Sequence, residues 1–326
     1  MKEEVMGGEP VRLILGSGRS GTTWIQDSLA NANDLRPVFE PLKSVSSKVP
    51  QFEYAFLDKQ HQSPELKSFL SDVFNGQFRS IWSDYRMIPD RVIPSLSKVE
   101  SWESIKAYRR HLTQLLENYR MLSTALNHKS ILVKFIRANL MLSWLQANFD
   151  TRIALILRHP GAVIESQLRL GGESWDPVAR LSYYRHDSQF EAGLGERYGR
   201  YLKKDLSPAQ MNTLIWAIEN QYPLEQAESE TYRVFCYESL VNSPLEEWPK
   251  LTKVLDLKNV PQLSDLVKPS QQASSNWESE KKDYSKSAKW MSRISDKDRD
   301  EADIMLRMLG VRRYSMDEPN PKPGVF

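Results

Sequence analysis

The sequence has almost no cysteine and no long hydrophobic run. The single cysteine, Cys236, excludes an internal disulfide and is typical of a reducing compartment. Its neighbours Val234 and Phe235 predict a buried strand, so we interpret Cys236 as an inert core residue. The aliphatic run 153–157 is far too short to cross a bilayer, and residues 1–10 have mixed charge without a signal-peptide core. We therefore expect a cytoplasmic protein.

The sequence also has no excess of one charge. Its 44 lysines and arginines face 42 aspartates and glutamates, for a net charge of +2. This balance argues against a protein that coats nucleic acid or binds membranes through a polybasic patch. Histidines, cysteines and carboxylates do not recur at metal-site spacing, so we expect no metal, no nucleic-acid partner and no membrane partner. Any anion site must be local.

Short apolar segments alternate with helical ones along the chain. Strands are expected at 11–15, 130–136, 151–157 and 231–236. Helices are expected at 24–32, 102–127, 140–149, 212–228 and 295–309, and two more begin near Pro160 and Pro244. This alternation predicts a single α/β domain over 1–326, with a central parallel sheet flanked by helices and ligands at the carboxyl ends of the strands.

Three segments show little periodicity. Residues 42–130 are interpreted as a helical or irregular insertion that shapes an acceptor site. Residues 171–207 and 262–290 are polar, so we expect loops or lids over the site.

A glycine-rich segment, GSGRSGTT at 16–23, lies between the first strand and the first helix. Glycines let backbone N–H groups close around an anion, and the helix N-terminus adds its positive dipole end. Arg19 supplies a fixed charge, and Thr22 and Thr23 supply hydroxyl groups. This context predicts a phosphate-binding loop rather than an ordinary glycine turn.

The loop differs from the one that binds nucleoside triphosphates. In a Walker A loop, GxxxxGK[ST], the lysine reaches the β- and γ-phosphates. Gly16 and Gly21 keep that spacing, but Thr22 stands where the lysine would be. The loop therefore suits a nucleotide with one 5′-phosphate that bears another group.

Three motifs together resemble the sulfotransferases that use 3′-phosphoadenosine-5′-phosphosulfate (PAPS). RSGTTW at 19–24 is similar to the family's 5′-phosphosulfate loop, (K/R)SGTTW. RHPGAVIES at 158–166 keeps the family's spacing between an arginine at a strand end and a serine eight residues later. VFCYESL at 234–240 resembles the strand that ends in FYEDL. The resemblance implies a PAPS-dependent transfer to a hydroxyl or amine acceptor, such as a carbohydrate or a small molecule.

The resemblance also implies roles for individual residues. Arg158 and Ser166 would bind the 3′-phosphate, and Tyr237 would lie beside the adenine or the 3′-phosphate. Trp24 would stack on adenine. The alternatives are a strand-end salt bridge for Arg158, a polar position on the helix surface for Ser166 and a core position for Trp24. The 5′ side of the donor would be held by Arg19, Ser20, Gly21, Thr22 and Thr23.

The residues expected to do the chemistry are Arg19, Lys134 and Glu40. Arg19 and Lys134 are the cations that could neutralise charge on the leaving phosphate, although Lys134 could also be a snorkelling edge-strand residue. In the cytosolic family members the lysine is followed by a histidine base, but that position here is Ile136. Glu40, in VFEPL, resembles the glutamate of tyrosylprotein and carbohydrate sulfotransferases, so we predict that Glu40 is the base. Its alternative is a structural pair with an arginine.

One family feature is missing. The chain has no RKGxxG segment near its C-terminus, and Ser274, Ser275 and Lys286 are the candidates to complete the 3′-phosphate site. Two other functions stay open: a P-loop kinase or NTPase, and a non-catalytic protein that binds PAP, the desulfated nucleotide. The acceptor and the oligomeric state do not follow from the sequence.

Overall fold

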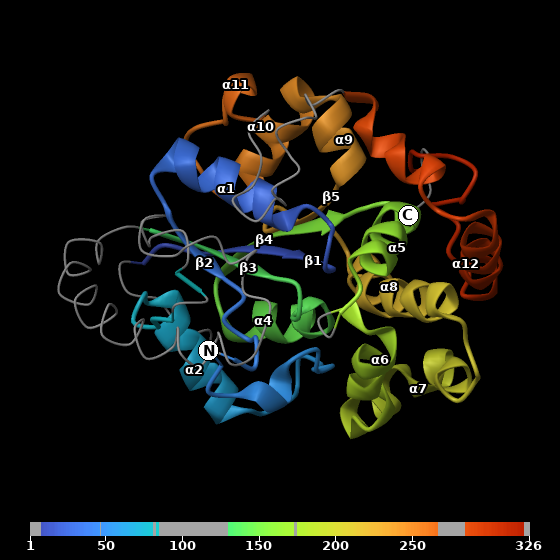
Figure 1. Cartoon of the computed structure of the whole chain (residues 1–326). Helices are drawn as coiled ribbons and strands as arrows, with labels where there is room; N and C mark the ends of the chain where they lie inside the picture. The colour runs from blue at the N-terminus through green and yellow to red at the C-terminus, as the bar shows by residue number, and fades with distance from the viewer. Residues whose placement is uncertain are drawn as a thin grey trace, which may run out of the picture.

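The computed structural model describes residues 8–45, 47–80, 83–84, 130–172, 175–266 and 284–322. Its centre is a five-stranded sheet in the order β2-β3-β1-β4-β5, and all four pairings are parallel (Figure 1). The strands are β1 (Val11–Gly16), β2 (Arg36–Phe39), β3 (Ile131–Phe135), β4 (Thr151–Leu157) and β5 (Tyr232–Cys236). The expected α/β class and parallel sheet are confirmed.

The sheet is parallel and buried because its strands are almost entirely apolar. β1 is buried along its whole length, and β4 is buried except at Arg152. Ile14 and Ile156 pack against helices on one face, whereas Leu13 and Leu155 pack on the other. Strands that are covered on both faces read as continuous apolar runs, which is the pattern of these segments.

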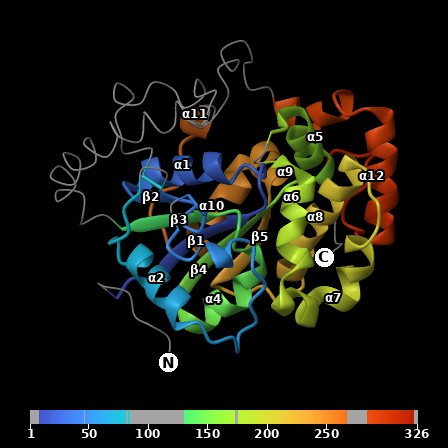
Figure 2. The ribbon, with the colours of Figure 1, turned by 60° about the horizontal axis from the view of Figure 1, so that its bottom comes forward.

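Helices form a layer on each face of the sheet. Figure 1 shows α1, α9 and α10 above the sheet and α2 and α4 below it. Figure 2, turned by 60°, keeps α5, α6, α7, α8 and α12 together on the side away from α2. The α-helices are α1 (Thr22–Asn33), α2 (Pro64–Phe74), α4 (Leu142–Asn148), α5 (Pro160–Leu170), α6 (Pro177–Arg185), α7 (Ser188–Leu202), α8 (Pro208–Leu224), α9 (Tyr237–Asn242), α10 (Pro244–Val254), α11 (Leu263–Leu266) and α12 (Asp296–Met308). The 3₁₀ helices are η1 (Pro50–Phe52), η5 (Asn139–Met141) and η8 (Tyr284–Ser292).

Local signals explain where several helices begin. Proline occupies the first turn of α5, α8 and α10, where its missing N–H costs nothing. Ser207 caps α8 and forms a capping box with Gln210, and Ser295 caps α12 as the sequence predicted. In the described part of the chain, no helix is long and apolar enough to cross a membrane.

The expectation of irregular backbone over 171–207 is wrong, because most of this segment is helical. Asp176 and Asp187 cap α6 and α7 through their carboxylates. In α7, Phe190, Leu194 and Tyr198 recur every four residues and are buried in the core beside α8. The polar composition of the segment hid this helical stripe.

Other expectations are tested only in part. Within 42–130, the structure describes η1 and α2, whereas the helix expected at 102–127 lies outside the described residues. Within 262–290, it describes α11 and the start of η8. Whether these segments act as lids or shape an acceptor site stays a prediction.

Candidate active site

The glycine-rich loop joins the carboxyl end of β1 to α1, at the edge of the sheet where ligands bind. Gly21 precedes α1 with a φ of 89°, and a Cβ there would lie 2.5 Å from the Tyr237 ring. Only glycine suits that position. Arg19 also has a positive φ, 73°, which turns its carbonyl toward Arg158. The start of the loop is held by a hydrogen bond from the Gly16 N–H to Asn139 Oδ1 at 3.1 Å.

The loop has the features of an anion cradle. The first turn of α1 has no acidic side chain, so the positive end of the helix dipole is not neutralised locally. Ser20 is buried, and its Oγ has no hydrogen-bond partner within the structure. Thr23 Oγ1 accepts a hydrogen bond from Lys134 Nζ at 3.3 Å. A phosphate or sulfate oxygen in the loop would supply the partner that Ser20 lacks.

A second group lies on one side of the loop and brings together four predicted residues. Arg19 Nε donates to Ser166 Oγ at 3.0 Å, and Arg158 Nη1 donates to the Arg19 carbonyl at 2.8 Å. The Arg158 guanidinium also lies 4.5 Å from the centre of the Tyr237 ring. Its Nε has no partner within the structure. We call Arg19 and Arg158 the arginine pair.

The arginine pair concentrates positive charge. Limited hydration of its head group and the neighbouring charge of Arg158 lower the pKa of Arg19 to about 10, although the residue as a whole is exposed. Among the described residues, no carboxylate forms a salt bridge with Arg19 or Arg158. A phosphate between them would relieve this repulsion.

Trp24 lies beside the arginine pair but also belongs to the packing of the helices. Its Nε1 donates to the Leu266 carbonyl at 3.1 Å, and the side chain is half-buried. The ring meets Tyr237 edge-on at 5.7 Å and Trp248 at 5.2 Å. Trp24 is therefore part of the helix packing, as the core alternative expects. It also lies near Tyr237, so its stacking on adenine stays a prediction.

A third group lies at the ends of β2 and β3. Lys134 Nζ is 3.1 Å from Glu40 Oε1, and Arg137 Nη1 is 3.0 Å from Glu40 Oε2. Arg137 Nε also donates to Glu53 Oε1 at 2.5 Å. All four side chains are buried. We call Lys134, Glu40, Arg137 and Glu53 the buried charge cluster.

Strand register brings Lys134 and Glu40 together. Phe39 of β2 pairs with Lys134 of β3, and the Glu40 N–H donates to the Lys134 carbonyl at 3.0 Å. Glu40 then turns the chain with a φ of 46°. A left-handed backbone costs a non-glycine residue about 1–3 kcal/mol and persists only where its surroundings hold it. The two cations that bind Glu40 supply such a hold.

Glu40 is fully buried, with 0% of its surface exposed. Its Oε1 forms an ion pair with Lys134 but no well-aligned hydrogen bond, so this oxygen keeps capacity to accept one. Burial lowers the pKa of Lys134, and the charge of Glu40 acts in the opposite direction. Lys134 also lies 3.7 Å from the centre of the Phe39 ring. Glu40 is closed to solvent in this conformation, and its pairing with Arg137 matches the structural alternative.

Arg137 and Glu53 of the cluster were not predicted from the sequence as site residues. The only sequence signal for Arg137 is a second cation three residues after Lys134, directly past the end of β3. Glu53 Oε2 accepts the Ser44 N–H at 3.2 Å, which ties η1 to the turn after β2. Lys43 lies near these charges. Burial is the main cause that lowers its pKa to about 8, and the positive charge of Arg137 is the second.

The predicted transfer cations do not lie in one contact group. Arg19 contacts Ser166, whereas Lys134 contacts Glu40 and Thr23. The glycine-rich segment 16–23 connects them, because Arg19 lies in its turn and Thr23 in the first turn of α1. Their cooperation in transfer stays a prediction.

The remaining face of the loop is covered by apolar side chains. A Cβ on Gly18 would lie 2.5 Å from the Trp175 ring and 3.5 Å from Ile136 Cδ1. Ile136 stands where the resemblance implies a histidine, and it is buried. Gln167 Nε2 donates to the Gly18 carbonyl at 3.1 Å, so α5 holds the loop from the same side. Trp175 had not been predicted; it follows two glycines in a segment without clear pattern.

His159, next to Arg158, is a structural residue. It is fully buried, its Nδ1 accepts the Gly161 N–H, and its Nε2 lies 3.1 Å from the Ser315 carbonyl. Burial lowers the pKa of His159 to about 3, so the ring is neutral near pH 7. It stacks on Trp290 of η8 at 4.5 Å. Of the C-terminal candidates, Ser274 and Ser275 and the side chain of Lys286 lie outside the described residues.

Comparisons with known proteins add a resemblance of fold. No family model matches the sequence, and no curated protein matches it. The chain is similar to the sulfotransferase domain from the curacin biosynthetic pathway, with 19% identity, a TM-score of 0.46, and coverage of 95% of this chain and 99% of that one. It is also similar to the sulfotransferase domain from the Synechococcus PCC 7002 olefin synthase, with 18% identity, a TM-score of 0.43 and 97% of each chain covered. Such distant likenesses leave the function to be argued from the residues of this chain.

Proposed function

We propose that this protein is a sulfotransferase that moves a sulfuryl group from PAPS to a hydroxyl or amine acceptor and releases PAP. One observation carries the proposal: a glycine-rich loop without a lysine supplies Arg19 to the arginine pair and contacts Lys134 of the buried charge cluster through Thr23. The first group suits a nucleotide with a second phosphate, and the second places Lys134 beside the loop.

The residues fit the donor at both of its anionic ends. The loop N–H groups and Ser20 Oγ would hold the 5′ side, where Ser20 lacks a partner. Arg158 Nε, which also lacks a partner, and Ser166 Oγ would hold the 3′-phosphate. Tyr237 and Trp24 would line the adenine side. PAPS supplies an activated sulfuryl group, and the protein supplies position and charge.

In the proposed reaction, the acceptor oxygen forms a bond to sulfur while the bond from sulfur to the phosphate oxygen breaks. The acceptor proton leaves to Glu40, and the negative charge that develops on PAP is stabilised by Arg19 and Lys134. Because Glu40 is fully buried, this role requires the acceptor to enter beside Lys134 and Thr23. Breaking the poorly aligned contact between Lys134 and Glu40 Oε1 would free that oxygen.

A non-catalytic PAP-binding protein is the second candidate, and the burial of Glu40 favours it. Under this alternative the arginine pair still binds the nucleotide, but the buried charge cluster only stabilises the ends of β2 and β3. The two candidates therefore agree on binding and differ on turnover.

The test has two parts. Calorimetry with PAP, adenosine 5′-phosphate and ATP with Mg²⁺ measures whether the 3′-phosphate is recognised; equal affinity for PAP and adenosine 5′-phosphate would contradict both candidates. Transfer from radiolabelled PAPS to a panel of alcohols, phenols, sugars and amines then measures turnover. Tight PAP binding without transfer to any acceptor, and without slow hydrolysis of PAPS, would leave the non-catalytic candidate.

A further inference from the structure

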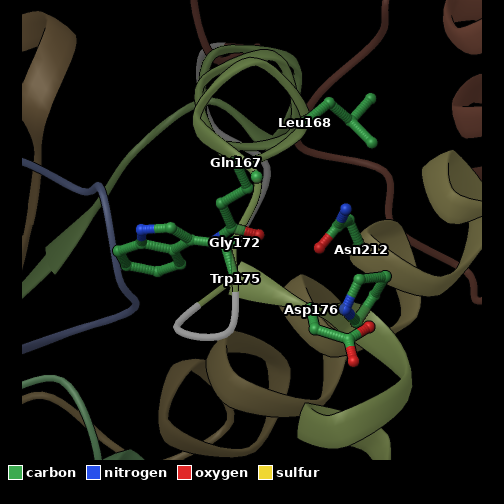
Figure 3. Close-up of a pocket in the computed structure, with 8 residues that line it drawn as sticks. Gln167, Leu168, Gly172, Trp175, Asp176 and Asn212 are labelled. Carbon is green, nitrogen blue, oxygen red and sulfur yellow. The ribbon is translucent and has the colours of Figure 1, made fainter. Parts of the chain in front are cut away.

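A hollow of about 410 Å³ lies among α5, α6 and α8, behind the loop (Figure 3). Gln167 and Leu168 form its α5 wall, Asp176 and Pro177 form its α6 wall, and Asn212 of α8 closes it. Its volume lies within the roughly 300–1,000 Å³ that is usual for small-molecule sites.

Asn212 is the unusual residue of this hollow. Its surface is only 1% exposed, yet neither its amide oxygen nor its amide nitrogen has a hydrogen-bond partner within the structure. Figure 3 shows the amide facing the space between Gln167 and the start of α6. Buried polar groups are nearly always paired, so an amide with two unpaired atoms points to a missing partner.

The neighbouring polar groups do not supply that partner. The Gln167 amide is directed elsewhere, because its Nε2 donates to the Gly18 carbonyl and its Oε1 accepts from Arg180 Nη1. Asp176 Oδ1 accepts the Val178 N–H as the cap of α6. Among the described lining residues, Asn212 is therefore the buried side chain whose two polar atoms both lack a partner.

From these observations we propose that the hollow binds a small neutral molecule through a carboxamide, lactam or urea group. Such a group presents C=O and N–H side by side and satisfies both atoms of the Asn212 amide. A carboxylate would leave Oδ1 unpaired and would be repelled by Asp176; an ammonium, although attracted by Asp176, would leave Nδ2 unpaired. Leu168, Pro177 and Trp175 offer apolar surface for the rest of the molecule.

The site would communicate with the loop through two of its own residues. Trp175 lines the hollow and packs its ring on Gly18, and Gln167 holds the Gly18 carbonyl. The amide group has two sources that share this chemistry: the distal end of the acceptor itself, or a separate small molecule. The site does not depend on the proposed transfer activity.

Three probes of nearly the same size and ring shape test the chemistry. δ-Valerolactam offers C=O and N–H, δ-valerolactone offers only acceptors, and piperidine is cationic. Ligand-observed NMR should show saturable binding of the lactam, in the millimolar range that is usual for so small a molecule, and at least about ten-fold weaker binding of the other two. Equal binding of all three, or no saturable binding of the lactam, would overturn the proposal.

Asn212→Leu keeps the volume and removes the amide, so it should weaken lactam binding by about ten-fold or more. Asn148→Leu is the control, because the Asn148 amide donates to the Trp144 carbonyl in α4, away from the hollow. The melting temperature of Asn212→Leu should not fall, since no protein hydrogen bond is lost. A drop of several degrees, with lactam binding unchanged, would show that Asn212 is satisfied by the fold or by ordered water.

Competition separates the two sources. If the lactam competes with an accepted substrate in the transfer assay, the hollow binds the distal end of the acceptor. If the lactam binds without competing, the hollow takes a separate molecule, whatever its effect on PAP affinity. Both results support the site, whereas binding that persists at full strength in Asn212→Leu contradicts it.

Discussion

The arginine pair and the buried charge cluster are both in contact with the glycine-rich loop, but they differ in whether their cations are paired with carboxylates. In the arginine pair, two cations lie close together, and among the described residues neither forms a salt bridge with a carboxylate. In the buried charge cluster, Lys134 and Arg137 both face carboxylates at ion-pair distance. Among the described residues, the cations of the first group therefore have no carboxylate partner, whereas those of the second are paired with carboxylates in the free protein. Binding should therefore be sensitive at the arginine pair, and stability at the cluster.

The largest expected effect is the loss of turnover in Glu40→Gln, because glutamine keeps the shape of the side chain but cannot accept a proton. If Glu40 is the base, turnover should fall by about 10²–10⁴, and calorimetry should find PAP affinity unchanged. The melting temperature should also fall, because loss of one partner of a buried pair costs about 3–5 kcal/mol.

Glu53→Gln is the matched control for that experiment. It removes a carboxylate from the same Arg137 and should lower stability by a similar amount. Turnover should be retained. Equal losses of activity in the two variants would make Glu40 a structural residue and would remove the catalytic role from the cluster.

Arg158→Ala tests whether the arginine pair awaits a phosphate. Loss of a charge-assisted partner should weaken PAP binding by about 2–4 kcal/mol, roughly 30- to 1,000-fold, and leave adenosine 5′-phosphate affinity almost unchanged. Arg233→Ala, on the exposed side of β5, is the arginine control. Unchanged PAP affinity in Arg158→Ala would mean that the pair does not bind the 3′-phosphate.

Ser166→Ala should have a smaller effect of the same kind. The Ser166 hydroxyl accepts from Arg19 in the free protein and is expected to bind the 3′-phosphate with Arg158. Its loss should weaken PAP binding about ten-fold. Ser182→Ala, in which an exposed hydroxyl of α6 is lost, serves as the control in the same titration. An effect as large as that of Arg158→Ala would show that Ser166 also holds Arg19 in place.

The smallest effect concerns Lys43, beside the buried charge cluster. Its pKa in the folded protein is about 8, below the ordinary value of 10.5. Between these values the unfolded chain binds more protons, so this group makes stability rise with pH. The melting temperature of Lys43→Met should therefore exceed that of the wild type most at pH 7, by a few degrees at most, and the difference should shrink toward pH 10.5. A difference that does not change with pH would place Lys43 in solvent; Lys48→Met is the exposed control.

The elements that were predicted correctly depend on short-range patterns. The strands at β1, β3, β4 and β5 are apolar runs bounded by turn residues, and each lies within a residue or two of its expected bounds. The spacing of Arg158 and Ser166 came from the resemblance to the family motif; the strand and the helix expected around them are both present in the structure. Such features need no knowledge of tertiary neighbours.

The features that were missed depend on distant partners. β2 has only four residues and begins with Arg36, which is buried because Asp84 pairs with it at 2.7 Å. A buried arginine followed by proline does not read as a strand in sequence. In the same way, the role of Arg137 requires Glu40 and Glu53, which lie 97 and 84 residues away. Whether Glu40 is exposed could not be judged from VFEPL alone.

The inward position of Thr22 limits how this scaffold can be re-engineered. Thr22 is buried, and its methyl group would lie 2.8 Å from a Cβ placed on Gly16. A lysine introduced there, to restore the Walker A pattern, would start from a buried position packed against Gly16 at the end of β1. Thr22→Lys should therefore yield an overpacked, destabilised protein instead of an ATPase. If the loop binds the proposed nucleotide, its selectivity would depend on how tightly this position is packed, and one substitution would not change it.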